Sequence, residues 1–480
     1  MEAMGHEPTS CQRRFIADSA AFMTSPDHDI MVVSGYAGTG KTTVLSALVK
    51  ACRNVGIRTV LLAPTGRSAK VLGSYSSCMA YTIHKHIYRQ KSVGGDGFGQ
   101  FSLSPNKAKH TLFIVDEVSL IGIDAASGRE GAAGANFGTG NLLGDLVDFV
   151  RSGVECRLML VGDSAQLPPI GLDQSPALNM DYMNSCFGGV MSSQLSTVVR
   201  QAAESGILHN ATLIRNIISA IDQDGDYGGP DGEGHRLRLE LDGFDDISVV
   251  MGGELIDCIS DAYREYGDDQ TMILTRSNKR AIRYNKGIRS QVQFKEENLV
   301  RGDRLMVVKN CYQFLENIKE MDYIANGDIL KLLKISEHEE RYGLRFATAH
   351  VSFPDYDDVE LRVKVILDTL ESESPSLTYE QSNMLYQGVN EDYSWQTNKK
   401  KRYELVREDH YFNALQLKYS NAITCHKSQG GQWDCVFIDN AFWQDSLSLD
   451  DLKWLYTAMT RAKCMLYLVN YNKLEWPVEP

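Results

Sequence analysis

The chain has 480 residues, 43% hydrophobic and 23% charged, and its 49 basic and 62 acidic side chains give a formal net charge of −13. This apolar share can bury a sizeable core, which argues against a disordered chain, and the length favours roughly three domains of ordinary size, or two with insertions. No apolar run approaches the ~18 residues needed to cross a bilayer, and the first residues do not resemble a secretory signal. The acidic balance argues against coating nucleic acid through bulk charge, but it allows a local basic channel.

Ten cysteines are spread from Cys11 to Cys464 without a CxxC pair. This spacing favours neither a zinc site nor a disulfide framework. We therefore expect reduced thiols in a cytoplasmic protein without a membrane partner.

Short apolar runs rich in β-branched residues alternate with helical patterns, at 30–34, 59–63, 111–115, 157–161, 271–274, 435–438 and 465–469. Fully apolar runs of this length are typical of parallel strands buried on both faces. The pattern predicts an α/β fold with two doubly wound parallel sheets. In such sheets, ligands bind at the carboxyl ends of the strands.

Three stretches interrupt this alternation. Residues 88–110 contain the glycine-rich segment SVGGDGFGQF, and residues 125–140 form a Gly/Ala-rich loop to which we assign no function. From about 300 the pattern changes to short strands and turns, with Asn326-Gly327 as a hairpin signal. We predict a first domain at 1–190, a second at 191–299 and 403–480, and an inserted β-rich domain at 300–402.

The segment GYAGTGKT follows an apolar run and opens a helical pattern, which is the context that a phosphate-binding P-loop requires. Its glycines let backbone N–H groups turn toward phosphates, and the helix N-terminus adds positive charge. Lys41 is expected to reach the β- and γ-phosphates, and the Thr42 hydroxyl to ligate Mg²⁺. The predicted nucleotide-binding residues of this segment are Gly35, Gly38, Thr39, Gly40, Lys41, Thr42 and Thr43.

Two further apolar runs end in polar residues that suit ATP hydrolysis. The run at 111–115 is followed by Asp116, a candidate Mg²⁺ ligand, and by Glu117, a candidate base that orients or deprotonates the attacking water. The run at 157–161 leads to Gln166, whose neutral amide suits a γ-phosphate sensor. For Gln166 the alternative is a turn fixed by Pro168-Pro169.

Phosphoryl transfer also needs positive charge on the leaving γ-phosphate, which arginine supplies. Arg200 ends the segment LSTVVR, and Arg461 lies in YTAMTRA, on a helical pattern that leads into the last apolar run. Without further context, each would be interpreted as a surface ion-pair residue.

Nine motifs follow one another along the chain: GYAGTGKT, APTGRSAKVL, TIHKHIY, FIVDEVSLI, LVGDSAQLPPIG, LSTVVRQ, ILTRSNKRAIRYN, NAITCHKSQGGQWDCVFID and LYTAMTRAK. The set resembles the superfamily 1B DNA helicases of the RecD-like and Dda-like branch and covers almost the whole chain. The resemblance implies two RecA-like domains with ATP between them. It also implies 5′-to-3′ translocation on single-stranded DNA and duplex unwinding in replication, recombination or repair.

The same resemblance assigns roles to individual residues. Gln12 would read the adenine, and Gly431 would approach the nucleotide cleft. The ATPase roles argued above fall to Lys41, Asp116, Glu117, Gln166, Arg200 and Arg461.

Single-stranded DNA needs a groove with backbone donors and aromatic stacking faces. The candidate contacts are Pro64, Thr65, Arg67, Thr82, His84 and Lys85 in the first domain, and Thr424, His426 and Lys427 in the second. The segment Pro64 to Arg67 is expected on the face opposite the nucleotide-coupling residues.

The insertion at 88–110 occupies the place of the strand-separating pin in relatives. Phe98 and Phe101 are its candidates for stacking on the terminal base pair, and a flexible loop with two incidental aromatic residues is the alternative. The β-rich segment at 300–402 resembles the SH3-like module of this branch.

We expect a monomeric motor that uses ATP and Mg²⁺ and binds single-stranded DNA and single-strand/duplex junctions. A single-strand-binding protein and other replication or repair factors are further candidate partners. An RNA-directed helicase of the same superfamily, a P-loop ATPase that remodels protein, and a non-catalytic binding subunit are the alternatives.

Overall fold

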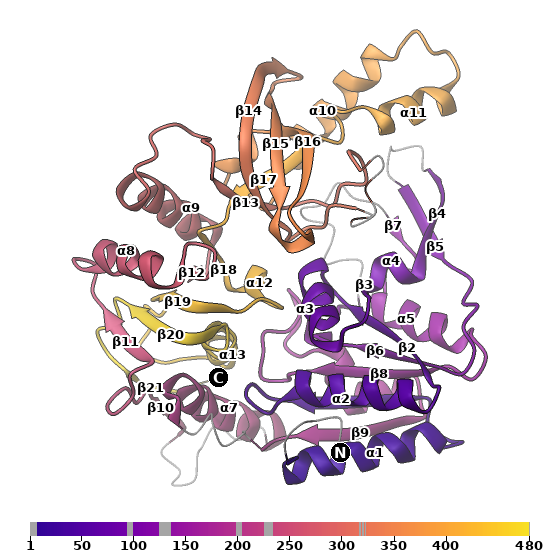
Figure 1. Cartoon of the computed structure of the whole chain (residues 1–480), viewed down its shortest axis with the longest axis vertical. Coiled ribbons are helices and arrows are strands. Elements are labelled where there is room, and N and C mark those ends of the chain that lie inside the picture. Colours follow the sequence, from indigo (N-terminus) through magenta and orange to yellow (C-terminus); the bar gives the residue numbers. More distant parts are fainter. Residues whose placement is uncertain are drawn as a thin grey trace.

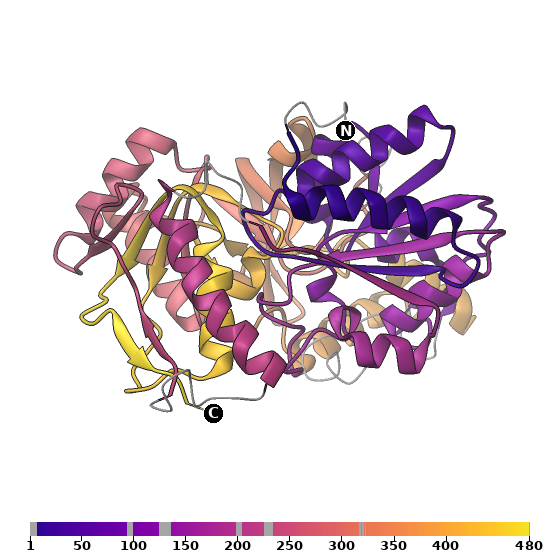
Figure 2. The same cartoon turned by 90° about the horizontal axis from the view of Figure 1, so that it is seen from below.

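The computed structural model describes residues 7–93, 99–123, 136–197, 204–224, 234–315, 318, 321 and 323–479. Two parallel sheets lie side by side (Figures 1 and 2). A closed barrel lies at one end of the pair, above both sheets in the view of Figure 1. None of the helices in these ranges is long and apolar enough to span a membrane. All ten cysteines fall within them, and each is a free thiol.

The first sheet has six parallel strands in the order β3-β2-β6-β8-β1-β9. Its strands are β1 (Ile30–Gly35), β2 (Arg58–Ala63), β3 (Ala80–Thr82), β6 (Thr111–Val115), β8 (Arg157–Gly162) and β9 (Val190–Leu195). Its helices are α1 (Ser10–Thr24), α2 (Lys41–Asn54), α3 (Gly66–Ser76), α4 (Ile83–Ile87), α5 (Leu142–Arg151) and α6 (Met180–Cys186). Because β9 pairs with β1, residues 191–195, which we expected in the second domain, belong to the first sheet.

Both faces of the first sheet are buried, as the apolar runs predicted. In β1, Ile30 and Val32 pack into one hydrophobic cluster, while Met31 and Val33 pack into another on the opposite face. Successive side chains of a strand point to opposite faces, so a strand covered on both sides must be apolar throughout.

The second sheet has five parallel strands in the order β11-β20-β19-β12-β18. They are β11 (Ile247–Val250), β12 (Thr271–Thr275), β18 (Ala422–Thr424), β19 (Trp433–Asp439) and β20 (Ala462–Val469). The helices are α7 (Gly206–Asp224), α8 (Leu255–Tyr266), α9 (Asn278–Gly287), α12 (Cys425–Ser428) and α13 (Leu449–Met459). A small ribbon pairs β10 (Arg236–Arg238) with β21 (Glu475–Pro477). All seven predicted apolar runs are strands of the two sheets, which confirms the predicted fold class.

The inserted module is a closed barrel, drawn in orange at the top of Figure 1. Its strands are β13 (Arg304–Val307), β14 (Ile329–Arg341), β15 (Leu344–Phe353), β16 (Val359–Ile366) and β17 (Leu415–Tyr419). Two helices that we did not predict, α10 (Tyr379–Asp392) and α11 (Lys399–Glu408), separate β16 from β17. The barrel therefore extends past the expected boundary at 402, because β17 closes it by pairing with β13 and β16.

The insertion after α4 forms an antiparallel hairpin of β4 (Tyr88–Val93) and β5 (Gly99–Leu103), flanked by β7 (Asn136–Phe137). Phe98 lies outside the described residues. Phe101 is in strand β5 and packs against the core of the first domain. It therefore lies midway along the hairpin, opposite Gln90, with its ring against the domain core.

A buried ion-pair cluster ties the barrel to the second domain. The Asp303 carboxylate, 2% exposed, lies 2.9 Å from both the Arg289 guanidinium and the Lys295 ammonium, and it also accepts the Val300 N–H.

We predict that Asp303→Ala lowers the free energy of unfolding by about 3 to 5 kcal/mol, because two positive charges lose their buried partner. Urea unfolding measures this loss. Asp261→Ala, which removes a solvent-exposed partner of Arg264, should cost no more than about 1 kcal/mol. Equal losses in the two variants would contradict the prediction.

Candidate nucleotide and nucleic-acid sites

The P-loop joins β1 to α2 and wraps closely around one lysine. Gly38 and Gly40 have φ of 73° and 76°, a region that residues with a side chain rarely adopt. A Cβ on Gly35 would lie 2.7 Å from the Lys41 side chain, so only glycine fits there. The Lys41 ammonium donates to the Gly35 carbonyl at 2.5 Å and lies 3.6 Å from the Asp163 carboxylate. The backbone thus holds the lysine at the mouth of the loop.

A cavity of about 630 Å³ opens beside the P-loop, between the two sheets. Nine of the predicted nucleotide-site residues line it: Gly38, Gly40, Lys41, Thr42, Thr43, Asp116, Glu117, Gln166 and Arg461. Thr39 is buried within the loop, where its hydroxyl donates to the Tyr36 carbonyl. Arg200 lies outside the described residues.

Two acidic side chains meet where β6 ends. Asp116 accepts the Glu117 N–H at 2.9 Å, and Glu117 itself is in the left-handed region with φ of 56°. Burial and the nearby Glu117 charge raise the pKa of Asp116 to about 7, and Lys41 partly opposes this shift. The Thr42 hydroxyl lines the same cavity. A hydroxyl and a carboxylate beside phosphates are the oxygen donors that suit Mg²⁺, so these residues fit the predicted metal.

Two buried side chains from different domains face this cavity with unused polar groups. The amide Oε1 of Gln166, a residue only 5% exposed, has no hydrogen-bond partner in the described structure. Arg461, 3% exposed, donates to the Thr457 and Gly431 carbonyls and to the Thr460 hydroxyl. No carboxylate among the described residues pairs with it, although buried cations normally have an anionic partner. The Arg461 guanidinium suits an anionic ligand such as a phosphate, whereas the Gln166 oxygen suits a hydrogen-bond donor such as a water molecule.

Gln12 does not face the cavity as an adenine reader would. Its side chain is fully buried, its amide NH₂ donates to the Thr39 carbonyl at 3.0 Å, and its oxygen accepts the Thr9 N–H. Thr9 and Gln12 form the capping box of α1. The predicted contact with adenine is therefore replaced in this structure by a brace between α1 and the P-loop.

Arg67 lies on the nucleotide side of α3, which corrects its predicted place in a DNA track on the opposite face. Its guanidinium lies 4.3 Å from the ring centroid of Trp433 and lines the cavity with Arg461. Gly431 makes this stacking possible, because a Cβ there would lie 2.8 Å from the Arg67 guanidinium. Thr65 caps α3 through the Ser68 N–H, and Pro64 precedes it at the end of β2.

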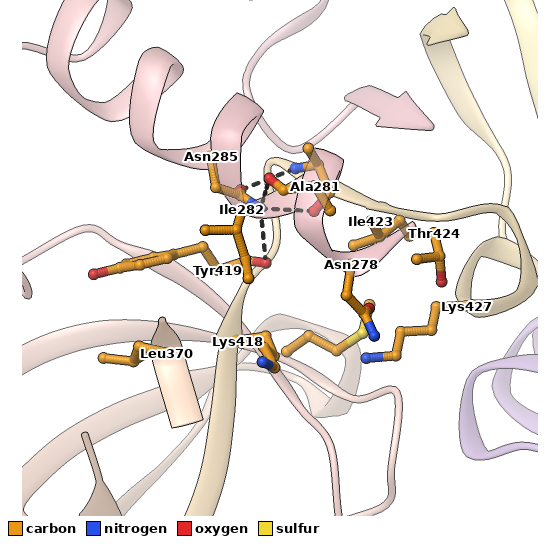
Figure 3. A pocket seen from close by; sticks show the side chains of 12 residues that line it. Asn278, Ala281, Ile282, Asn285, Leu370, Lys418, Tyr419, Ile423, Thr424 and Lys427 are labelled. Carbon is orange, nitrogen blue, oxygen red and sulfur yellow. Dashed lines mark hydrogen bonds between the residues drawn. The ribbon is translucent and has the colours of Figure 1, made fainter. Parts of the chain in front are cut away.

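The candidate DNA contacts of the second domain lie beside a pocket next to the barrel (Figure 3). Thr424 and Lys427 line it together with Lys418 of β17 and Asn278 of α9. Burial lowers the pKa of Lys418 and of Lys427 to about 8, and neither has an acidic partner in the part of the chain that is described. The sequence reasoning missed Lys418, whose only signal was a lysine within an otherwise buried strand. His426 is not part of this pocket.

In the first domain, the barrel covers part of the predicted track. The Thr82 hydroxyl is buried against the Tyr323 hydroxyl of the barrel segment. Burial lowers the pKa of His84 to about 4, so its ring is neutral at physiological pH. The exposed Lys85 ammonium lies 5.1 Å from the ring centroid of Tyr81. Lys85 therefore offers a charge at this position, while Thr82 is already bonded.

The P-loop at the end of β1 and the cavity bounded by the second sheet define a P-loop NTPase with two RecA-like domains. A family model described as an AAA domain matches residues 12–128, and one described as a UvrD-like helicase C-terminal domain matches residues 419–469. The motif order and these two models, each of which matches a part of the chain, show its similarity to superfamily 1B helicases of the RecD type.

The ATP-dependent RecD2 DNA helicase of Deinococcus radiodurans is 33% identical over 184 residues, which cover 38% of this chain and 21% of that protein. An uncharacterised protein of Methanocaldococcus jannaschii is 30% identical over 151 residues, which cover 29% of this chain and 11% of that protein. The aligned regions are therefore a minor part of both relatives.

Among solved structures, a Pif1 helicase from Bacteroides in complex with ADP-AlF3 and ssDNA is 14% identical, with a TM-score of 0.48. The match covers 99% of this chain and 95% of that one. Pif1 helicase from Candida albicans is also 14% identical, with a TM-score of 0.39, and the match covers 97% of this chain and 95% of that one.

Proposed function

We propose that this chain is an ATP-dependent DNA helicase that moves along single-stranded DNA, 5′ to 3′, and unwinds duplex ahead of it. One observation carries the proposal. The cavity that holds Lys41, Asp116, Glu117 and Gln166 of the first domain is completed by Arg461 of the second. Hydrolysis then depends on how the two domains sit relative to each other, which is what a motor requires.

Each residue has a chemical task in this proposal. Lys41 and the P-loop N–H groups bind the β- and γ-phosphates, and Glu117 orients and deprotonates the attacking water. Thr42 and Asp116 would hold Mg²⁺, and the bound metal would supply positive charge to the phosphates. Gln166 and Arg461 contact the γ-phosphate from the two sides of the cleft.

The DNA track follows the carboxyl-end loops of both sheets and the side of the barrel. Thr424, Lys427 and Lys418 contact backbone phosphate in the second domain, and Lys85 does so in the first. The net charge of −13 leaves the outer surface acidic, so binding is confined to this track and is weak and salt-sensitive.

We predict that single-stranded DNA binds less tightly as pH rises from 7 to 9. Lys418 and Lys427, with pKa values of about 8, are charged below that pH and lose their charge above it. The Kd should rise by roughly 10-fold across this range, measured by fluorescence anisotropy without nucleotide. Replacing both lysines by arginine should remove most of this rise, because arginine stays charged. Lys400→Arg, an exposed position on α11, should leave it unchanged. A pH-independent Kd in the unmodified protein would contradict the assignment.

A strand-displacement assay tests the function directly. Duplexes with a 5′ tail, a 3′ tail or no tail are compared in the presence of ATP and Mg²⁺, and only the 5′-tailed duplex should be unwound efficiently. Lys41→Ala should abolish unwinding on every substrate. Unwinding from a 3′ tail alone would overturn the polarity, and unwinding by Lys41→Ala would overturn the mechanism.

A second measurement distinguishes the DNA helicase from the three alternative functions. ATP turnover is followed with DNA oligonucleotides, with RNA oligonucleotides of the same sequence, and without nucleic acid. Stimulation by RNA alone would favour an RNA-directed helicase, and stimulation by neither would favour a protein-remodelling ATPase. Stimulation by DNA together with hydrolysis that requires Lys41 excludes the non-catalytic subunit.

A further inference from the structure

One tyrosine of the second domain reaches the P-loop of the first. The hydroxyl of Tyr456, in α13, accepts the Ala37 N–H at 2.9 Å and donates to the Asp163 carboxylate at 2.8 Å. The Tyr456 side chain is only 1% exposed, so this hydroxyl is screened from water. It therefore joins the P-loop and the end of β8 across the domain boundary.

The neighbouring P-loop residue is held by the second domain as well. Tyr36 packs into the hydrophobic cluster that contains Ile214 of α7. Its hydroxyl pairs with that of Ser219 at 3.2 Å, and the Arg215 guanidinium lies 4.6 Å from its ring centroid. Two consecutive residues of the phosphate-binding loop thus depend on α7 and α13, which Figure 2 shows lying together beside the first domain.

The Tyr456 hydroxyl also binds the carboxylate that lies beside the P-loop lysine, Lys41. The Asp163 oxygen that accepts the Tyr456 O–H is also the oxygen that lies 3.6 Å from the Lys41 ammonium. The other Asp163 oxygen accepts the Ala165 N–H. A buried carboxylate that already accepts two hydrogen bonds has less need of a tight ion pair. Tyr456 and Lys41 thus share one oxygen of the Asp163 carboxylate.

We propose that Tyr456 is a positioning residue that the second domain contributes to the P-loop, so that the loop and Lys41 are set for hydrolysis only while the domains are docked. The inference rests on the proposed ATPase function. When the domains separate, the Ala37 N–H and Asp163 lose this hydroxyl, and Asp163 can pair closely with Lys41. Nucleic acid that favours docking thereby raises ATP turnover without touching the nucleotide.

Tyr456→Phe tests the inference, because it removes only the hydroxyl. The kcat of single-stranded-DNA-stimulated ATP hydrolysis should fall about 10- to 100-fold, since a buried donor and acceptor lose their partner. Turnover without DNA should fall much less. The ratio of DNA-stimulated to basal turnover, the stimulation ratio, should therefore fall as well. The KM for ATP should change less than the stimulated kcat.

The control is Tyr471→Phe. Tyr471 is buried in the same hydrophobic cluster, but its hydroxyl has no hydrogen-bond partner in the described structure. This variant should keep the unmodified stimulation ratio. A second variant, Ser219→Ala, removes the hydroxyl contact of Tyr36 and should lower the ratio to a smaller degree.

The outcomes separate the two proposals. If the unmodified protein shows DNA-stimulated hydrolysis and Tyr456→Phe keeps its stimulation ratio, the inference is wrong and the proposed function stands. If Tyr456→Phe lowers basal and stimulated turnover equally, together with the melting temperature, the residue is structural and the inference is also wrong. A protein that lacks stimulated hydrolysis before any substitution contradicts the proposed function itself.

Discussion

Replacing Arg461 by lysine is expected to lower the kcat of DNA-stimulated ATP hydrolysis by about 10³-fold or more. Lysine keeps the positive charge, but it loses the planar fork that contacts two phosphate oxygens at once. The buried Arg461 guanidinium is positioned by three hydrogen bonds to Thr457, Gly431 and Thr460, and a lysine ammonium cannot reproduce this geometry. A phosphate-release assay at saturating ATP and DNA measures the loss.

The control separates loss of catalysis from loss of folding or binding. Arg264→Lys, at an exposed position on α8, should behave as the unmodified protein does. For Arg461→Lys, DNA affinity without nucleotide should change little, because the arginine lies in the nucleotide cavity. A variant that retains more than about a tenth of the unmodified kcat would show that Arg461 does not act on the transition state.

Glu117→Gln is expected to lower the kcat by about 10²- to 10⁴-fold, the range for removal of a general base. The substitution preserves size and removes one charge, so ATP binding should be retained. The pKa of Asp116 should also fall, because the Glu117 charge that helps to raise it is gone. Single-turnover hydrolysis measures the loss of catalysis, and the affinity for a fluorescent ATP analogue measures ATP binding.

An acid far from the cavity provides the comparison for Glu117. Glu155→Gln, at an exposed position where the side chain pairs with His110, should leave hydrolysis unchanged. If Glu117→Gln loses ATP affinity in proportion to kcat, the residue binds nucleotide and does not activate water. That result would move the role of base to another side chain.

Seven of the eleven strands of the two sheets, and the P-loop, could be predicted because each depends on neighbours in the chain. A strand covered on both faces requires an unbroken apolar run, and residues 112–115 show one. The P-loop requires glycines at fixed spacing before a helix, and Gly38 and Gly40 adopt the left-handed conformations that this spacing implies.

Other features depended on partners distant in sequence. Arg67 was assigned to the wrong face because Trp433, on which it stacks, belongs to the other domain. The tight hairpin of the barrel is formed by Tyr342-Gly343, with φ of 52° and 69°, a turn for which a tyrosine gives no signal. The Tyr342 hydroxyl bonds to Asp392 of α10, and its ring lies edge-on to Tyr411. These contacts stabilise a conformation that the local sequence does not favour.

Local patterns were thus sufficient to establish two parallel sheets, a phosphate-binding loop and the acids that follow β6, since hydrophobic periodicity and motif spacing act over a few residues. Only the tertiary structure showed three other features. Tyr456 and Arg461 of the second domain lie beside the P-loop, Gln12 bonds to the P-loop residue Thr39, and β17 closes the barrel. Packing between distant segments sets these contacts, and no pattern within a short stretch of sequence specifies which segment will pack against which.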